Sequence, residues 1–296
     1  MIPNGAVEET LAVEGRFSET PTLPSMRVAL CQMRSGEDVG ANVSLAERLL
    51  EEAADGDADL AALPEVFTYL GSAAGRAAAA EPVPGPTTDR LAAIARARGM
   101  WVLGGSVIES SDDHRYATSV LLDRDGELVA TYRKIHLYDV DLPGQSPFRE
   151  SATFTAGDQL VTHEADVARL GLSICYDVRF PELYRGLMVM GAEVLFVPAQ
   201  FQHETGKDHW EVLLRARAIE NQCFVVAPGQ WGTFGDPEKG RRSYGNSMAV
   251  DPWGRVLVRA PDEGDGVWFA DLDMTELRRV RQVLPALQHR QLGLTC

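Results

Sequence analysis

Strand-like and helix-like patterns alternate along the chain from residue 26, with no linker rich in Gly, Ser or Pro to divide them. Residues 26–33 are an apolar run typical of a buried strand, and residues 39–55 then carry apolar side chains at helical spacing. Strand pairs joined by short turns, such as DRDG at 123–126, lie between such units. These patterns predict one α/β domain over residues 26–296, built in layers on mixed sheets.

Composition and charge limit the partners of this domain. The 296 residues include 28 basic and 43 acidic side chains, and the formal net charge of −15 disfavours nucleic acid and anionic lipid surfaces. No apolar run approaches the ~18 residues that a membrane span needs. Residues 1–25 are polar, contain prolines and show no export or organelle signal, so we expect them to form a flexible N-terminal arm.

The four cysteines differ in what their surroundings predict. They have no paired spacing that would bind zinc or form a disulfide framework, which favours a reducing, cytoplasmic location. Cys31 and Cys223 lie inside strand patterns, where packing explains them, and Cys296 ends the chain. Cys175 stands where an apolar run stops, before Pro181 opens a helix. A thiol at such a turn could be a packed strand end, or a nucleophile with nearby amide groups aimed at an attacked carbonyl.

Two other apolar runs also end on an ionisable residue. In DLAALPEVF the strand pattern ends at Glu65, whose carboxylate would become a useful base if burial raised its pKa. In ELVATYRK the strand pattern ends at Lys134, whose ammonium could stabilise a thiolate or an oxyanion. Taken alone, each could equally be a solvated strand end.

Metal and dinucleotide sites are not indicated. The segment HETGKDH at 203–209 lacks the spacing of a zinc motif, and no second cluster of ligands accompanies it. The glycines near residues 101–105 and 229–235 do not form a phosphate-binding fingerprint between a strand and a helix. We therefore expect no metal and no organic cofactor.

Three segments, in this order and at these separations, resemble the signature segments of the nitrilase superfamily of carbon–nitrogen hydrolases. They are LPEVF (63–67), YRKIHLYD (132–139) and CYDVRFPELYR (175–185). The resemblance extends from about residue 26 to about residue 292. It implies a four-layer α-β-β-α sandwich of two mixed sheets, a homodimer or larger homo-oligomer, and a small-molecule amide as substrate.

The resemblance also implies roles for individual residues. Glu65 would be the general base, Lys134 the cation that stabilises the tetrahedral intermediate, and Cys175 the nucleophile. The amide N–H of Tyr176 would complete the oxyanion hole, and Glu150 in FRES matches a second acid that helps to position substrate.

Arg179 and a basic loop leave alternatives open. Arg179 could hold a substrate carboxylate, or only pair with an acid such as Asp177 or Glu182. The loop at 229–245 offers further cations for an anionic substrate, or merely a solvated face; these cations are Lys239, Arg241 and Arg242. Asn246 stands where similar proteins commonly have histidine.

The segments that follow Cys175 look most like those of the deaminated glutathione amidases, with the omega-amidases next. This similarity implies a hydrolase of linear amides that acts through an acyl-thioester on a small anionic 2-oxo acid amide of the N-(4-oxoglutaryl)-L-cysteinylglycine type. Three alternatives are an omega-amidase acting on 2-oxoglutaramate or 2-oxosuccinamate, an N-carbamoyl-amine hydrolase with the same triad, and a non-catalytic scaffold. A Cys–His hydrolase that uses His136 is a further possibility.

Overall fold

Two six-stranded sheets form the centre of the protein in the computed structural model, which describes residues 25–141, 147–234 and 241–292. In the first sheet the three middle strands are parallel and the outer pairs are antiparallel. Its order is β16 (Gly266–Asp273), β1 (Ser25–Gln32), β2 (Leu60–Ala62), β3 (Trp101–Ser111), β4 (His114–Leu122) and β5 (Leu128–Arg133).

The second sheet repeats this arrangement. Its central strands are again parallel, and antiparallel strands flank them on both sides. The order is β15 (Val256–Arg259), β14 (Met248–Val250), β11 (Phe224–Ala227), β10 (Val194–Phe196), β9 (Arg169–Leu172) and β8 (Val161–Glu164). Both sheets are therefore mixed, as predicted.

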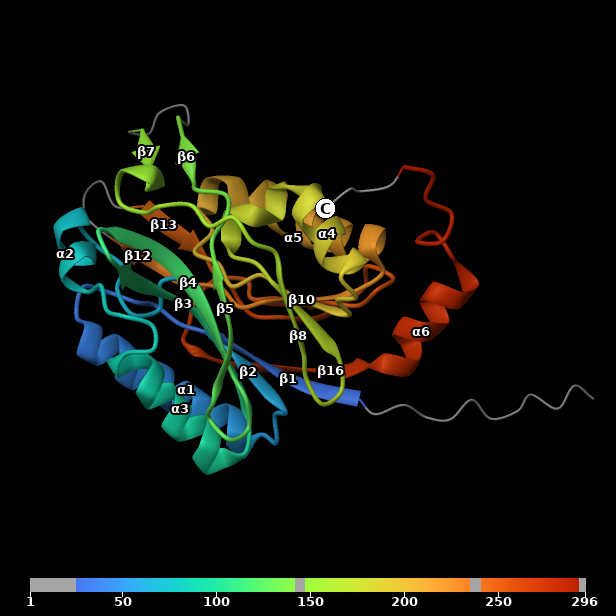
Figure 1. The fold of residues 1–296 in the computed structure, drawn as a ribbon, viewed down its shortest axis with the longest axis horizontal. Helices are drawn as coiled ribbons and strands as arrows, with labels where there is room; N and C mark the ends of the chain where they lie inside the picture. Colours follow the sequence, from blue (N-terminus) through green and yellow to red (C-terminus); the bar gives the residue numbers. More distant parts are fainter. Residues whose placement is uncertain (1–24, 142–146, 235–240, 293–296) are drawn as a thin grey trace, which may run out of the picture.

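Helices cover the outer face of each sheet (Figure 1). The first sheet is covered by α1 (Val39–Asp55) and α3 (Pro86–Arg98), and the second by α4 (Pro181–Val189) and α5 (His203–Asn221). The predicted α-β-β-α sandwich is confirmed.

Strand β1 shows why the sequence produces this layering. Its side chains alternate between two hydrophobic clusters, because successive residues of a strand point to opposite faces of the sheet. Val28 and Leu30 join the large cluster that includes residues of both sheets, whereas Ala29 and Cys31 pack with residues of α1 such as Leu50. Apolar side chains on both faces give the continuous apolar run that predicts a buried strand.

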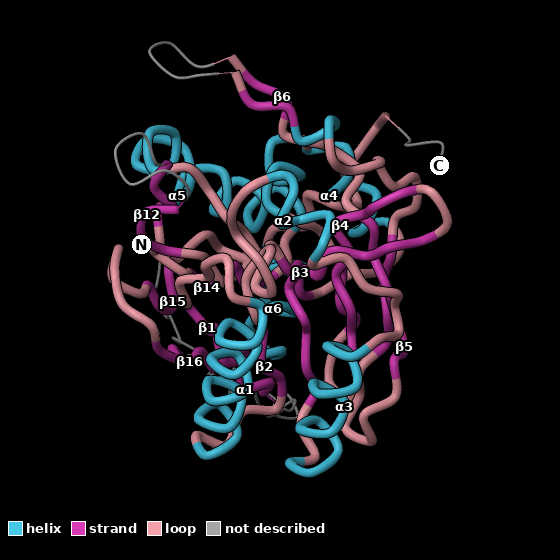
Figure 2. Tube along the Cα trace, turned by 90° about the vertical axis from the view of Figure 1, so that its left-hand side faces the viewer, coloured by secondary structure: helices cyan, strands magenta, loops and turns pink. Residues whose placement is uncertain are grey.

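Shorter elements surround one end of the sandwich. They are α2 (Ala73–Ala78), β6 (Asp139–Val140), β7 (Phe148–Arg149), β12 (Trp231–Phe234), β13 (Arg241–Tyr244) and the 3₁₀ helices η1 (Glu150–Ala152) and η2 (Cys175–Arg179). The hairpin of β6 and β7 projects beyond the helical layers (Figures 1 and 2). The segment at 229–245, predicted as a loop, includes the antiparallel pair β12 and β13. That part of the prediction was wrong.

Two helices differ from the sequence-based expectation. The apolar spacing predicts a helix over residues 208–222, whereas α5 begins five residues earlier at His203, because its first turn is polar and carries no apolar periodicity. The sequence patterns did not predict α6 (Met274–Val283), which buries only Met274, Leu277 and Val280 among charged neighbours. Asp273 caps this helix by accepting a hydrogen bond from the N–H of Thr275 at 2.8 Å.

Some sequence-based predictions fall on residues that the structure does not describe. The arm predicted over residues 1–25 lies outside the described residues except for Ser25, the first residue of β1. Cys296 and Lys239 also lie outside them. No helix within the described part of the chain is long and apolar enough to cross a membrane.

Candidate active site

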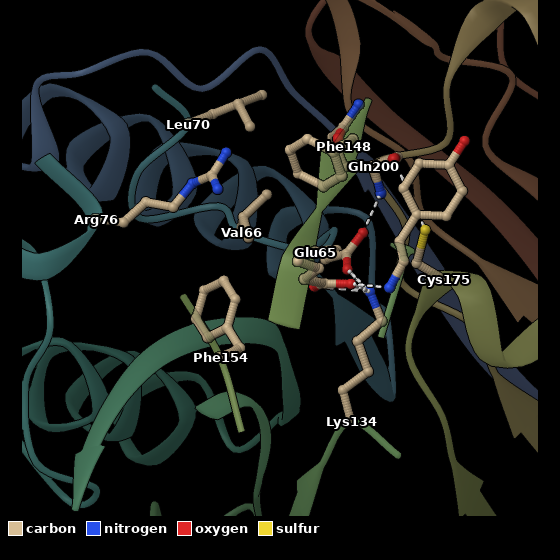
Figure 3. A pocket seen from close by; sticks show the side chains of 11 residues that line it. Glu65, Val66, Leu70, Arg76, Lys134, Phe148, Phe154, Cys175 and Gln200 are labelled. Carbon is tan, nitrogen blue, oxygen red and sulfur yellow. Dashed lines mark hydrogen bonds and ion pairs between the residues drawn. The ribbon is translucent and has the colours of Figure 1, made fainter. Parts of the chain in front are cut away.

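The ends of several strands meet at one edge of the sandwich and deliver the ionisable residues to it. Glu65 follows β2, Lys134 follows β5 directly, and Cys175 follows β9. Carboxyl ends of parallel strands face the same edge of a sheet, where α/β folds commonly bind ligands. The three side chains line one cavity, and Figure 3 shows Glu65, Lys134 and Cys175 converging on it.

Lys134 connects two carboxylates. Its Nζ donates to Oε1 of Glu65 at 2.8 Å and to Oε1 and Oε2 of Glu150 at 3.0 and 2.8 Å. Lys134 is 2% exposed, Glu65 4% and Glu150 6%, so both ion pairs are almost completely shielded from water. Such shielding makes each charge strongly dependent on its partners.

Two turns of the site contain a residue in an unusual backbone conformation. Cys175 has φ 46° and Val66, next to Glu65, has φ 49°. Residues other than glycine rarely adopt this left-handed region, and such strain is concentrated at functional sites. The N–H of Val66 donates to Oγ of Ser106 at 2.8 Å, and the N–H of Cys175 donates to the carbonyl of Pro198 at 3.0 Å. These bonds hold both turns against neighbouring strands.

Burial dominates the electrostatics of the site. Burial raises the pKa of Glu65, the charge of Glu150 raises it further, and the ammonium of Lys134 opposes both. Burial would lower the pKa of Lys134, but Glu150 and Glu65 outweigh that effect and raise it well above its usual range. Burial and then the charge of Glu65 raise the pKa of the Cys175 thiol. The resting thiol therefore keeps its proton, and a base must remove it before the sulfur can attack.

Two residues that sequence reasoning missed hold the catalytic candidates in place. The N–H of Gln200 donates to Oε2 of Glu65 at 2.7 Å, and the carbonyl of Gln200 lies 3.7 Å from Sγ of Cys175. The buried carboxylate of Asp177 accepts from the hydroxyl of Tyr132, the N–H of His136 and the N–H of Ile174. A strand end followed by a polar residue is the only sequence signal for Gln200.

Cys175 lies between two cavities. The first is lined by Glu65, Val66, Leu70, Arg76, Lys134, Tyr138, Phe148, Glu150, Phe154, Cys175 and Gln200. The second shares Tyr138, Cys175 and Gln200 with the first and adds Tyr176, Arg179, Phe201, Gln202 and Thr205. A substrate bound across the sulfur could therefore occupy both.

Arg179 pairs with neither acid proposed as its partner. No ion pair joins it to Asp177 or Glu182, and all three residues are described. Its Nη1 lies 3.2 Å from Nδ1 of His209, and its Cζ lies 5.2 Å from the centroid of the Phe201 ring. The predicted pairing of Arg179 with Asp177 or Glu182 is therefore wrong; Asp177, itself a residue of η2, is buried and bonded to other partners.

His136 does not face the thiol. Its ring stacks on Phe180 with the ring centroids 3.6 Å apart, and Nδ1 lies 2.8 Å from Oδ1 of Asp177. His136 lines neither of the two cavities beside Cys175. This geometry disfavours a Cys–His hydrolase.

The basic residues of segment 229–245 have different positions. Arg242 forms ion pairs with Asp262 and Glu263, away from the cavities. Arg241 lies over the ring of Phe148, with its Cζ 4.4 Å from the ring centroid, and so borders the first cavity. Asn246 is buried, and its carbonyl accepts a hydrogen bond from Nε1 of Trp210 at 2.9 Å.

Comparisons with known proteins agree with this geometry. The carbon–nitrogen hydrolase family model matches residues 27–282. A Bos taurus protein named deaminated glutathione amidase is 42% identical over 289 residues, which cover 95% of this chain and 85% of that protein.

Solved structures show the same fold. The Caenorhabditis elegans NitFhit protein has a TM-score of 0.83 and 35% identity, and the match covers 91% of this chain and 66% of the longer NitFhit chain. Saccharomyces cerevisiae Nit3, a member of branch 10 of the nitrilase superfamily, has a TM-score of 0.81 and 29% identity. The match covers 92% of this chain and 98% of the Nit3 chain.

The resemblance predicted from three short segments is thus confirmed over most of the chain. The family model covers the strands that deliver Glu65, Lys134 and Cys175, and the relative from Bos taurus matches nearly the whole sequence. This chain belongs to the carbon–nitrogen hydrolase family of the nitrilase superfamily, and is a hydrolase of carbon–nitrogen bonds other than peptide bonds.

Proposed function

We propose that this protein is an amidase that uses Cys175 to hydrolyse a small anionic amide of the deaminated glutathione type. The observation that carries the proposal is the buried cluster of Glu65, Lys134 and Glu150 on the wall of the cavity that holds the thiol. Relatives named deaminated glutathione amidase, 42% identical over most of the chain, support the choice of substrate.

In the first half-reaction Glu65 acts as the base. It takes the proton of the Cys175 thiol while Sγ bonds to the amide carbonyl carbon, which produces a tetrahedral oxyanion. The carbon–nitrogen bond then breaks, and Glu65 gives its proton to the departing amine. An acyl-thioester on Cys175 remains. The raised pKa of Glu65 suits a group that must both accept and return a proton.

Water completes the cycle. Glu65 takes a proton from water as the water oxygen bonds to the thioester carbon, and a second tetrahedral oxyanion forms. The carbon–sulfur bond then breaks, the proton returns to sulfur, and the carboxylic acid leaves. No cofactor takes part in these steps.

Lys134 and a backbone amide stabilise the oxyanion. The pKa of Lys134 is raised by its two carboxylates, so the ammonium remains charged throughout the working pH range. The N–H groups of Cys175 and Asp177 already donate to the carbonyls of Pro198 and Ile174. The N–H of Tyr176 lies between them in the chain and is the donor that we assign to the oxyanion hole. Glu150 positions Lys134 through two hydrogen bonds.

Arg179 supplies a cation for the acyl half of the substrate. It lines the second cavity with Phe201 and Thr205, beside the sulfur, and no acid neutralises it within the described residues. A guanidinium binds a carboxylate through two parallel hydrogen bonds, which would fix the 2-oxo acid end of the amide.

Turnover of two amides, measured side by side, tests the substrate. We expect release of cysteinylglycine from deaminated glutathione at a higher kcat/KM than release of ammonia from 2-oxoglutaramate. Cys175→Ala should lower kcat by at least about 10⁴-fold because no thioester can form. Cys223→Ala, which removes a thiol buried in the core, should stay within about threefold of the wild type. Faster release of ammonia would favour an omega-amidase, and CO₂ release from a ureido compound would favour an N-carbamoyl-amine hydrolase.

Replacing the base separates the Glu65 mechanism from a Cys–His mechanism. Glu65→Gln should lower kcat/KM by about 10²–10⁴-fold, the usual contribution of a general acid–base group. His136→Ala should change it by less than about tenfold, because His136 faces Phe180 and Asp177. Steady-state kinetics on the same amide give both numbers. The mechanism is wrong if the histidine variant loses more activity than the glutamine variant.

The dependence of activity on pH follows from the raised pKa of Glu65. Protonating the base as pH falls removes activity, so the acid limb of kcat/KM should lie above the usual glutamate range. Glu150→Gln removes a like charge that raises the pKa of Glu65, and should move this limb to lower pH. A limb that stays in place or moves to higher pH would contradict the assignment of Glu65 as base.

We also propose that the enzyme is a homodimer or larger homo-oligomer. Val212 and Ile219, seven residues apart on α5, are apolar side chains that are 66% and 49% exposed. The exposed Trp253 lies in a turn next to this helix, because Nε of Arg215 donates a hydrogen bond to the carbonyl of Gly254. Light scattering after size exclusion should give at least twice the mass of 32.3 kDa. Val212→Asp should reduce that mass and Val283→Asp on α6 should not; a monomeric wild type would refute the proposal.

A cytoplasmic location fits the thiols. Cys31, Cys175 and Cys223 are all free in the structure, and a reducing compartment keeps a nucleophilic cysteine as its thiol. Fractionation of cells would test this location.

A further inference from the structure

Arg76 is an unassigned cation in the first cavity. It lies on α2, and its guanidinium extends toward the space beside Val66, Leu70 and Phe148 (Figure 3). Its side chain donates no hydrogen bond and forms no ion pair to any residue in the described part of the chain. Its one ring contact places Cζ 5.7 Å from the centroid of Phe148.

The surroundings of Arg76 favour an anion from outside the chain. Burial lowers the pKa of Arg76, since the surrounding apolar side chains replace part of its water. The carboxylates whose charges act on Arg76, Glu150 and Glu65, are already bonded to Lys134. A partly desolvated guanidinium without a partner gains more from binding an anion than a solvated one. Arg241, on the same Phe148 ring, adds a second positive charge at this end of the cavity.

The position of Glu65 decides which half of the substrate enters this cavity. The departing nitrogen must receive a proton from Glu65, so the amine half must lie on the side of the sulfur where Glu65 lies. Glu65 lines the first cavity with Arg76 and does not line the second. The acyl half then extends into the second cavity, toward Arg179.

We propose that Arg76 binds the carboxylate of the departing amine half. It would thereby select amides whose amine half carries a carboxylate over amides that release ammonia. This inference rests on the proposed function. In deaminated glutathione the amine half is cysteinylglycine, whose terminal carboxylate is the matching group. Each half of that substrate would then have one arginine, Arg179 for the acyl half and Arg76 for the amine half.

Binding to an inactive enzyme tests the contact directly. In the Cys175→Ala background, deaminated glutathione should lose about 10- to 100-fold in affinity on Arg76→Gln, the range for a hydrogen bond to a charged group. The same ligand with its terminal carboxylate converted to an amide should bind the Cys175→Ala enzyme as weakly as the acid ligand binds the enzyme that also carries Arg76→Gln. Adding Arg76→Gln should weaken binding of this amide ligand by less than about threefold. Arg76→Lys should restore part of the affinity. Isothermal titration calorimetry gives all these values.

Arg278→Gln is the matched control, because Arg278 is exposed on α6, across the molecule from α2 in Figure 1. We expect it to bind both ligands as the unchanged background does. If Arg76 only balanced the charges of Glu65 and Glu150, Arg76→Gln would weaken the acid and the amide ligand equally. That equality would overturn the inference.

The same variants separate the inference from the proposed function. Suppose that the wild type turns over deaminated glutathione but Arg76→Gln weakens binding of the acid and the amide ligand equally. The proposed function then stands, and the role of Arg76 is refuted. Suppose instead that the wild type does not turn over deaminated glutathione but binding depends on both Arg76 and the terminal carboxylate. The proposed substrate is then refuted, and the contact between Arg76 and a carboxylate is supported.

Discussion

The buried ammonium of Lys134 between two carboxylates is the interaction on which the active site depends. Removing the ammonium would leave two like charges without a partner in a place with almost no water, which is far more costly than losing a surface ion pair. The same ammonium donates to Glu65 and lines the cavity that holds the thiol, where the proposed oxyanion would form. One side chain thus fixes the position of Glu65 and supplies a positive charge to the cavity, and in the proposed mechanism it also stabilises the intermediate.

The backbone around this ion-pair cluster is held by a second buried carboxylate. Asp177, in the turn that begins with Cys175, accepts hydrogen bonds from Tyr132 and His136 on either side of Lys134. The thiol and the ammonium come from different sheets, and this carboxylate joins the two chain segments directly. A reacting geometry needs such support, because small displacements of catalytic groups are expensive in rate.

An overall charge of −15 does not prevent an anionic substrate from binding, because local charge controls binding at short range. Arg179 and Arg76 stand in separate cavities on either side of Cys175. Their spacing along the substrate path, and not the net charge of the chain, would decide which amides fit. Arg242 illustrates the difference: it is next to the buried Ser243 in the chain, yet its charge is neutralised by Asp262 and Glu263 at the surface.

The sequence by itself determined the layers and the catalytic triad candidates. Strands buried on both faces leave continuous apolar runs, as in β1, and Glu65, Lys134 and Cys175 each stand where such a run ends. Helix α6 and the early start of α5 escaped prediction because their polar faces hide the periodicity. Only the tertiary structure decided that Arg179 forms no ion pair with Asp177 and that Arg76 lines the first cavity. It also decided that Gln200 contacts both Glu65 and Cys175. The two contacts of Gln200 join residues far apart in the chain, and the positions of both arginines depend on how distant segments pack around the cavities, about which local sequence patterns carry no information.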